Sequence, residues 1–409
     1  MIIFNKNAAS VNPLNYADNE VKDLGNEVKK LCFVIGSLER GGTETHLKRV
    51  LPLLDRRRFK PSIFCFVRKG ELASALEEKG VKVFEPVLFS SLTKHSALFK
   101  PLLLVASIFS FISYLLRNKP DVVHFFLPAS YLLLGPISLL HKKSKKLMSR
   151  RSLNVYQQKY PAFIRGIELW LHQRMHGVIG NSQQVVNELK ADEGVPTNKL
   201  HLIYNGITVR ESSLSQREQI RVSLNIPPDR LVMTIVANLI PYKGHLDLLN
   251  ACGQLPTRDW ILLIVGHDSS SIQGELEHLV EQNNLQDCVH FLGVRNDVTD
   301  IWASSDIGLL VSHEEGFSNA VLEGMAANLP MIVTSVGGNA EAVLDGETGL
   351  VVPPHSPEDL ANAMKKLLKD NVLRHSMGKR AGQRVRQCFS MESCIEGYEA
   401  LYNQLFLEN

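Results

Sequence analysis

Residues 306–325 read Asp306-Ile307-Gly308-Leu309-Leu310-Val311-Ser312-His313-Glu314-Glu315-Gly316-Phe317-Ser318-Asn319-Ala320-Val321-Leu322-Glu323-Gly324-Met325. The aliphatic run at 307–311 predicts a short strand that is buried on both faces. Apolar residues then recur at helical spacing, and Ser318 or Asn319 is placed as the N-cap. The stretch therefore predicts a strand, an acidic turn and a helix, with Glu315 at the carboxyl end of the strand and Glu323 one turn into the helix.

Two carboxylates in this arrangement could face one crevice at a helix N-terminus. Carboxylates accept hydrogen bonds from hydroxyl groups, and the start of a helix favours anions, so the crevice suits a ligand that carries hydroxyls and phosphate. The alternative is that Glu314 and Glu315 are solvated turn residues. The pattern alone does not decide between these two interpretations, so the rest of the sequence is needed to choose between them.

Length and composition describe a globular protein of two or three domains. The chain has 409 residues, of which 44% are hydrophobic and 21% charged. Its six cysteines show no CxxC spacing, which is typical of reduced thiols and of the cytoplasm. The segment up to about residue 30 lacks the apolar run of a signal peptide, so none is expected.

The small net charge of +3 hides an asymmetry between the two halves. Residues 1–200 hold 30 Lys and Arg against 16 Asp and Glu, and between Glu85 and Glu168 the only acidic residue is Asp121. We expect the basic first half to meet something anionic, either a membrane surface or a charged acceptor, unless it is simply a solvated surface. Nucleic acid is not expected, because no binding motif accompanies the charge.

The first strand, residues 30–36, is followed by a glycine turn at Gly41 and Gly42 and a helix predicted over 43–54. This order is typical of a turn whose backbone N–H groups meet phosphate or sugar oxygens. The lysine of a phosphate-binding P-loop is missing, and so is the GxGxxG of a dinucleotide site. A P-loop NTPase and a dehydrogenase are therefore disfavoured.

Strands and helices alternate along both halves, which predicts two parallel, doubly wound sheets. A polar segment with Pro227-Pro228 separates the halves and is interpreted as a linker. The apolar stretch 101–116 is too short to span a bilayer and predicts either a core helix or an interfacial one. The strands are expected at 30–36, 62–67, 81–85, 122–126, 146–149, 177–180 and 200–204, and then at 231–237, 260–265, 289–291, 307–311, 331–333 and 349–352.

Further polar residues follow strands of the second half, at the sheet edge where open α/β folds bind ligands. Lys243 can stabilise charge on a phosphate leaving group, although a lone lysine at a helix start is often only a surface residue. Their convergence at one edge predicts a nucleotide site. Its candidate members around the sheet edge are Asn238, Lys243, Gly266, Val294, Arg295 and the glycine turn at Gly337-Gly338.

These motifs together resemble the retaining glycosyltransferases of family 4, which have the GT-B fold. The resemblance covers about residues 30–385 and rests on Glu315-Gly316-Phe317-Ser318-Asn319-x3-Glu323, Lys243-Gly244, Gly41-Gly42-Thr43-Glu44, Ile203-Tyr204-Asn205-Gly206 and Gly337-Gly338. It implies that Glu323 holds the ribose hydroxyls, that Glu315 lies by the donor sugar and that Lys243 binds the diphosphate. It also implies donor contacts from the glycine turn and from Phe317, Ser318, Asn319 and Ala320.

Two features depart from the family pattern. Many members carry an arginine where this chain has Asn238, and many carry a histidine at the second position of a His-x-His pair, where this chain has Phe126. Its only histidine there, His124, is a candidate catalytic residue or a core histidine. The chain has no Asp-x-Asp pair, and we expect neither a metal nor a cofactor beyond the nucleotide sugar.

We predict an α/β protein of the GT-B class, with two Rossmann-like doubly wound domains facing a cleft. Its expected function is the transfer of a sugar, from a donor that is UDP-linked, to a saccharide or lipid-linked acceptor in surface polysaccharide or lipopolysaccharide assembly. We expect it in the cytoplasm, with possible peripheral attachment to the inner face of the membrane. The expected segments are an extension at 1–29, an acceptor domain at 30–207, a linker at 208–229, a donor domain at 230–385 and a C-terminal helix at 386–409 that packs back on the first domain.

Three other functions share parts of this pattern. A GT-B sugar-nucleotide epimerase would use the same fold and donor site. An enzyme like glycogen phosphorylase would need a lysine that carries pyridoxal phosphate. A non-catalytic subunit that binds sugar nucleotides would fit the missing arginine.

Overall fold

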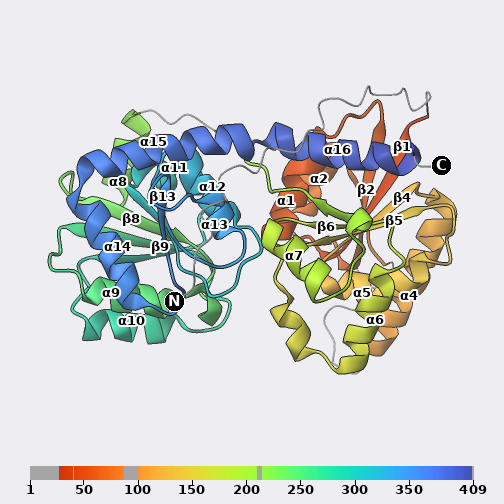
Figure 1. Cartoon of the computed structure of the whole chain (residues 1–409), viewed down its shortest axis with the longest axis horizontal. Helices are drawn as coiled ribbons and strands as arrows, with labels where there is room; N and C mark the ends of the chain where they lie inside the picture. The colour runs from red at the N-terminus through yellow and green to blue at the C-terminus, as the bar shows by residue number, and fades with distance from the viewer. Residues whose placement is uncertain (1–26, 40, 87–99, 210–213, 408–409) are drawn as a thin grey trace.

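The computed structural model describes residues 27–39, 41–86, 100–209 and 214–407, so most of the predicted extension at 1–29 lies outside the described residues. The described chain forms two α/β units that stand side by side (Figure 1). The long helices near the C-terminus run along one side of both units and connect them (Figure 1).

All strand pairs of the first unit are parallel, and among the described residues seven strands follow the order β3-β2-β1-β4-β5-β6-β7. The central strands β4, β5 and β6 are almost fully buried, as expected of a sheet covered on both faces, whereas the edge strands β3 and β7 are only partly buried. The strands are β1 Lys29–Ser37, β2 Phe59–Arg68, β3 Lys82–Phe84, β4 Val122–Phe126, β5 Lys145–Arg150, β6 Gly177–Gly180 and β7 Leu200–Leu202. The helices are α1 Gly42–Val50, α2 Ala73–Glu77, α4 Lys100–Asn118, α5 Pro128–Ser138, α6 Ala162–His172 and α7 Gln183–Ala191, with 3₁₀ turns at Leu51–Leu53, Asn154–Lys159 and Thr197–Lys199.

The second unit repeats this arrangement with a parallel sheet of six described strands in the order β10-β9-β8-β11-β12-β13. The strands are β8 Leu231–Val236, β9 Trp260–Val265, β10 Val289–Gly293, β11 Ile307–Leu310, β12 Met331–Thr334 and β13 Gly349–Val352. The helices are α8 Leu214–Ser223, α9 His245–Gly253, α10 Gln273–Gln282, α11 Val298–Ser304, α12 Asn319–Ala326, α13 Asn339–Ala342, α14 Pro357–Lys369 and α15 Asn371–Cys388, with a 3₁₀ turn, η5, at Pro241–Lys243.

In both sheets the strand order reverses direction beside the first strand, between β1 and β4 and again between β8 and β11. Open α/β sheets bind ligands outside the carboxyl ends of the strands at such a switch point. In the second sheet the segments that leave this point are 237–244, after β8, and 311–318, after β11. These are the two segments in which the sequence placed Lys243 and Glu315.

The C-terminal helix α16, Met391–Leu407, belongs to the core of the first unit although the chain has already completed the second. Its buried side chains pack with strands β1 and β4. The backbone of Ile207 pairs with the segment between α15 and α16. The chain therefore passes from the first unit to the second after Ile207 and returns near residues 389–391.

Two predicted boundaries need correction. The helix predicted over 43–54 ends at Val50 and continues as a 3₁₀ turn, because Pro52 has no N–H for the α-helical ladder. The segment 208–229 is not only a linker, because it contains α8, which packs on α11. Arg217 and Arg221 of α8 both bind the Asp306 carboxylate at 2.7 Å, which attaches this helix to the second unit.

The apolar helix α4 is neither fully buried nor able to span a bilayer. Phe111 and Leu115 pack in the core beside β2, whereas Phe109 and Leu116 are exposed. Among the residues that the structure describes, no helix combines the length and the apolar character needed to cross a membrane.

Candidate active site

Lys243 and Glu315 meet at the switch point of the second sheet. The Lys243 Nζ lies 2.5 Å from Glu315 Oε1, and the Ser312 hydroxyl donates to the same oxygen at 2.8 Å. Burial disfavours the lysine charge, but the Glu315 carboxylate and Tyr242 outweigh it and raise the pKa of Lys243. The structure thus brings together two of the predicted site residues as a charged, largely buried pair.

Gly244 allows this approach. Its φ of 74° lies in the left-handed region, and a Cβ there would collide with the carbonyl of Val311. Glycine is therefore required where the start of α9 packs against the loop after β11. This contact sets how closely Lys243 can approach Glu315.

Glu323 and Asn319 of α12 both reach residues of the first unit. The Glu323 carboxylate binds the Arg49 guanidinium of α1 at 2.7 Å, and the Asn319 amide donates to the carbonyl of Gly42 at 3.3 Å. The predicted ribose anchor and the glycine turn are therefore neighbours across the domain interface. Ser318 is the N-cap of α12 as expected, although its side chain makes no capping hydrogen bond, and Ala320 follows in the first turn.

Gly41 and Gly42 differ in the space available for a Cβ. A Cβ on Gly41 would collide with the carboxylate of Glu44, whereas a Cβ on Gly42 would meet nothing within 4 Å. Gly41 is the N-cap of α1, and burial raises the pKa of the Glu44 carboxyl beside it. The Glu44 carboxylate is the end of a flexible side chain that can move aside, so this contact does not by itself require glycine at 41, and Gly42 contributes its carbonyl to the interface.

The side chain of Phe317 points away from the predicted donor contacts. Its ring is buried and packs against Tyr204 and Phe389, at centroid distances of 5.0 and 5.2 Å. Its carbonyl accepts a hydrogen bond from the Asn205 amide at 2.9 Å. Phe317 therefore anchors the loop in the core between the units, and its side chain is not placed to meet a sugar hydroxyl.

His124 is a core histidine in this structure. It lies inside β4 with 1% of its surface exposed, and burial lowers its pKa to about 3. Its Nδ1 lies 3.0 Å from the Tyr402 hydroxyl and its Nε2 lies 2.8 Å from the Ser149 hydroxyl. Both ring nitrogens are thus engaged with protein groups, which argues against the catalytic role that the sequence left open.

The remaining candidates are held by contacts within the second unit. The Asn238 side chain accepts from the backbone N–H of His267 at 3.2 Å, so it braces the loop after β9. Gly266 packs against the carbonyl of Ala237, where a Cβ would not fit. Arg295 binds Asp297 within its own loop, and its neighbour Val294 is exposed.

Two residues of the interface were not singled out from the sequence. Arg49 looks like an ordinary surface arginine in the last turn of α1, and only the structure brings it to Glu323. Glu341, which follows the Gly337-Gly338 turn, accepts hydrogen bonds from the backbone N–H groups of Gln183 and Gln184 at 2.8 and 2.9 Å. The position of Gly337-Gly338 before Glu341 was the one available signal.

Two family models match the chain and together cover both units. The model described as "Glycosyl transferases group 1" matches residues 216–384, and the one described as "Glycosyltransferase Family 4" matches residues 40–211. The two matches meet between residues 211 and 216.

Curated relatives and solved structures agree with the family models. The chain is 30% identical over 228 residues to N-acetyl-alpha-D-glucosaminyl L-malate synthase of Bacillus anthracis, covering 56% of this chain and 57% of the relative. It is 26% identical over 397 residues to D-inositol 3-phosphate glycosyltransferase of Actinosynnema mirum, covering 90% of this chain and 93% of the relative. The match to the Bacillus anthracis protein and to two corynebacterial D-inositol 3-phosphate glycosyltransferases spans only about half of their length.

The fold is similar to that of Anabaena Alr3699/HepE, solved in complex with UDP and glucose. The two structures superpose with a TM-score of 0.78 at 21% identity, over 92% of this chain and all of the other. This similarity confirms the predicted two-domain GT-B architecture.

Proposed function

Because this chain belongs to the group 1 glycosyltransferases of family 4, we propose that it transfers a sugar from a nucleoside diphosphate sugar to an acceptor hydroxyl. The observation that carries the proposal is the Lys243–Glu315 pair at the switch point of the second sheet, with Glu323 one turn into the adjacent helix α12. UDP is the proposed nucleotide. It is supported by HepE, which has this fold and was solved with UDP and glucose.

In the proposed reaction the bond between the sugar C1 and the diphosphate oxygen breaks while the acceptor oxygen bonds to C1. Negative charge develops on the diphosphate, where the Lys243 ammonium and the start of α12 stabilise it. The departing phosphate oxygen takes the acceptor proton, so that the acceptor adds to the face the diphosphate leaves and the configuration is retained. Glu315 holds Lys243 in place before the donor arrives and then faces the donor sugar.

Donor class is tested by a thermal-shift panel of UDP-, GDP- and ADP-sugars. A ligand that binds only the folded state raises Tm, and its effect grows with concentration. We expect a rise with UDP-sugars and none with the other two. A rise with GDP-sugars alone would replace the proposed nucleotide, and no rise with any of the three would contradict the donor site.

Catalysis is tested by Lys243→Ala and Glu315→Ala, with Glu314→Ala as the matched control from the same loop. We expect each of the first two to lower turnover of the donor by at least about 100-fold, the usual effect of removing one group that stabilises transition-state charge. Glu314→Ala should stay within a few-fold of wild type. Normal turnover in folded Lys243→Ala protein would remove Lys243 from the mechanism, whereas a wild type that binds the donor without turning it over would favour a binding subunit.

The proposed acceptor is a saccharide or lipid-linked saccharide of surface polysaccharide or lipopolysaccharide assembly, presented at an anionic membrane surface. Support comes from helix α6, where Phe163, Ile167 and Trp170 recur on one helical face and are exposed, Phe163 by 67%. Helix α5 packs between α6 and α4, and α4 exposes Phe109 and Leu116. Apolar side chains with basic neighbours are typical of a surface that rests on anionic lipid.

Basic residues flank this apolar face. Lys142 and Lys143 are exposed in the turn after α5, and Lys159 and Arg165 are exposed before and on α6. The Arg174 guanidinium lies 4.0 Å from the ring centre of Trp170. In Figure 1 helices α4, α5 and α6 lie together at the lower end of the first unit.

Co-sedimentation with anionic and with zwitterionic liposomes at low salt tests this surface. We expect the wild type to bind the anionic liposomes and to be released by salt, because exposed charges are screened. The variant Phe163→Ser/Trp170→Ser should lose binding, whereas Val372→Ser, which changes an exposed valine of the second unit, should not. Absence of wild-type binding at low salt would remove the membrane from the proposal and leave the donor chemistry intact.

A further inference from the structure

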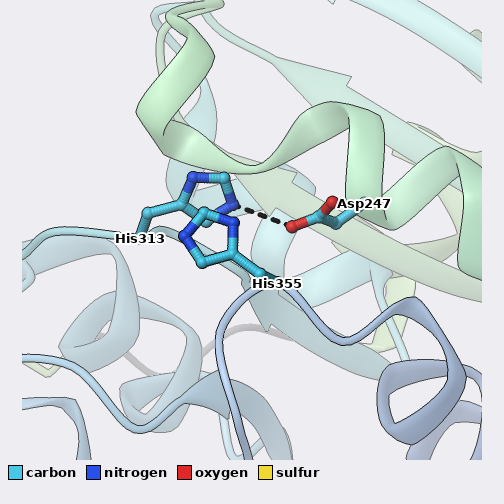
Figure 2. Close-up of side chains that lie close together, drawn as sticks. All are labelled: Asp247, His313 and His355. Carbon is cyan, nitrogen blue, oxygen red and sulfur yellow. Dashed lines mark hydrogen bonds and ion pairs between the residues drawn. The ribbon is translucent and has the colours of Figure 1, made fainter.

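Three potential metal ligands meet beside the Lys243–Glu315 pair. Asp247 lies in the first turn of α9, His313 in the loop after β11 and His355 in the loop after β13. One ligand atom from each of the three lies within 4.8 Å of the others. Figure 2 shows the two imidazole rings next to each other, tilted by 37°, with the Asp247 carboxylate directed at His313.

The distances fit a small ion. The His313 Nε2 lies 2.8 Å from the Asp247 Oδ2, and the ligand atoms of all three residues lie within 4.8 Å of one another. Ligand atoms of a tetrahedral zinc ion are separated by about 3.4 Å, since its bonds to nitrogen and oxygen are about 2.1 Å long. The three ligand atoms thus lie close to the spacing that a zinc ion requires.

The surroundings also suit a bound ion. The backbone N–H of His313 donates to the Tyr242 carbonyl at 2.7 Å, which fixes the loop that carries this ring. His355 has a φ of 57°, in the left-handed region that residues with a Cβ seldom adopt, and in this conformation its ring faces His313 (Figure 2). Asp247 and His313 are partly exposed and His355 is exposed, so that an ion can reach the group from solvent.

We propose that Asp247, His313 and His355 form a binding site for a divalent transition-metal ion, with zinc as the ion that the ligand set favours. Imidazole and carboxylate ligands in this combination are typical of zinc, whereas magnesium and calcium prefer oxygen ligands alone. Three protein ligands leave one tetrahedral position for water or another small ligand. The site is separate from the transfer reaction proposed above, which needs no metal.

The site would act on the loop that carries Glu315. Two contacts between charged or titratable side chains connect the segment at the beginning of α9 with this loop, Lys243 with Glu315 and Asp247 with His313. An ion bound by Asp247 and His313 replaces the contact between these two residues with two metal bonds. A third bond, from His355, attaches the loop after β13 to the same ion. Zinc binding thus stabilises this edge of the second sheet.

Calorimetric titration of chelator-treated full-length protein with zinc chloride tests the site, with magnesium and calcium chloride as controls. We expect about one zinc ion per chain, and at least a tenfold loss of affinity in Asp247→Asn and in His355→Asn, the scale of effect known for altered metal shells. Asparagine is chosen at 355 because it tolerates the left-handed backbone. His278→Ala is the matched control, since it removes an exposed histidine that lies 4.0 Å from a carboxylate without a third ligand.

Two further readouts do not depend on catalysis. Cobalt bound in place of zinc should give the visible absorption of a four-coordinate ion in the wild type but not in His355→Asn. Zinc should raise the Tm of the wild type and of His278→Ala, but not that of His355→Asn. The proposal is overturned if wild type binds zinc no more tightly than the Asp247→Asn/His355→Asn double variant. Because the measurements use zinc alone, their outcome is independent of whether the chain transfers sugars.

Discussion

Arg49 of α1 and Glu323 of α12 form an ion pair, 2.7 Å between Nη2 and Oε1, that joins the two units. Glu323 is the residue proposed to hold the ribose hydroxyls of the donor. In this structure its carboxylate is therefore already engaged by the other domain. A donor that uses Glu323 has to share this carboxylate with Arg49 or displace it.

We expect Arg49→Ala to tighten donor binding. The two side chains remain 33% and 20% exposed, and pairs of this kind contribute at most about 1 kcal/mol, or about fivefold in affinity. Calorimetric titration with the donor identified by the thermal-shift panel measures the change. Arg49→Lys, which can keep the ion pair, serves as the control, and weaker binding by Arg49→Ala would show that Arg49 itself contacts the donor.

Glu341 makes a second connection across the interface, and Glu341→Gln should loosen it. Its carboxylate accepts from two N–H groups at the start of α7 and from the Tyr204 hydroxyl at 3.0 Å. Glutamine removes the charge that favours a helix N-terminus and offers only one acceptor oxygen. We expect amide hydrogen exchange at Gln183 and Gln184 to accelerate by about tenfold, equivalent to about 1.4 kcal/mol.

The control for this measurement is Glu347→Gln, which removes an exposed carboxylate of the same region. Its exchange rates at Gln183 and Gln184 should match those of the wild type. Equal rates in Glu341→Gln and wild type would mean that the carboxylate charge does not hold the interface.

Most of the fold could be predicted because the strands are local signals. The largely apolar runs at 122–126, 177–180, 260–265 and 349–352 correspond to β4, β6, β9 and β13 with the same bounds. Buried parallel strands read as continuous apolar runs, so their sequence alone reveals them. The prediction of a linker at 208–229 missed α8 because this helix is polar. Its position depends on the ion pairs of Arg217 and Arg221 with Asp306, which is distant in sequence.

Part of the candidate site could also be predicted from the sequence. Lys243 and Glu315 each follow a strand of one sheet, and parallel topology brings such residues together. The positions of the Phe317 and His124 side chains could not be predicted in this way. The sequence around them does not indicate whether either side chain faces the core or the site. The partners Arg49 and Tyr402 come from elements more than 250 residues away in sequence from Glu323 and His124.

A buried charge cluster in the first unit should be essential for stability. Arg150 Nη2 binds Glu168 at 3.0 Å and Glu193 at 2.7 Å, and all three side chains are almost fully buried. Arg150→Met leaves two carboxylates without their cation, which should lower the free energy of unfolding by about 3–5 kcal/mol. Urea denaturation measures the change, and Arg57→Ala, which breaks an exposed ion pair with Asp55, should have no measurable effect.

Acid should destabilise the protein because its buried histidines resist protonation in the folded state. His124 is the histidine at which this effect can be tested. Burial lowers the pKa of His124 to about 3, from an ordinary value of 6.5. Because the folded-state pKa is the lower one, the unfolded chain binds more protons below pH 6.5, and stability falls as the pH drops from there towards 3. At pH 5 the loss of unfolding free energy from one such histidine is about 2 kcal/mol relative to pH 7.

His124→Gln should therefore reduce the difference in unfolding free energy between pH 7 and pH 5 by about this amount, whatever its effect on stability at pH 7. Urea denaturation at the two pH values measures the difference, and His278→Ala, which removes an exposed histidine, should leave it unchanged. A His124→Gln protein with the full wild-type pH dependence would show that His124 becomes protonated without unfolding.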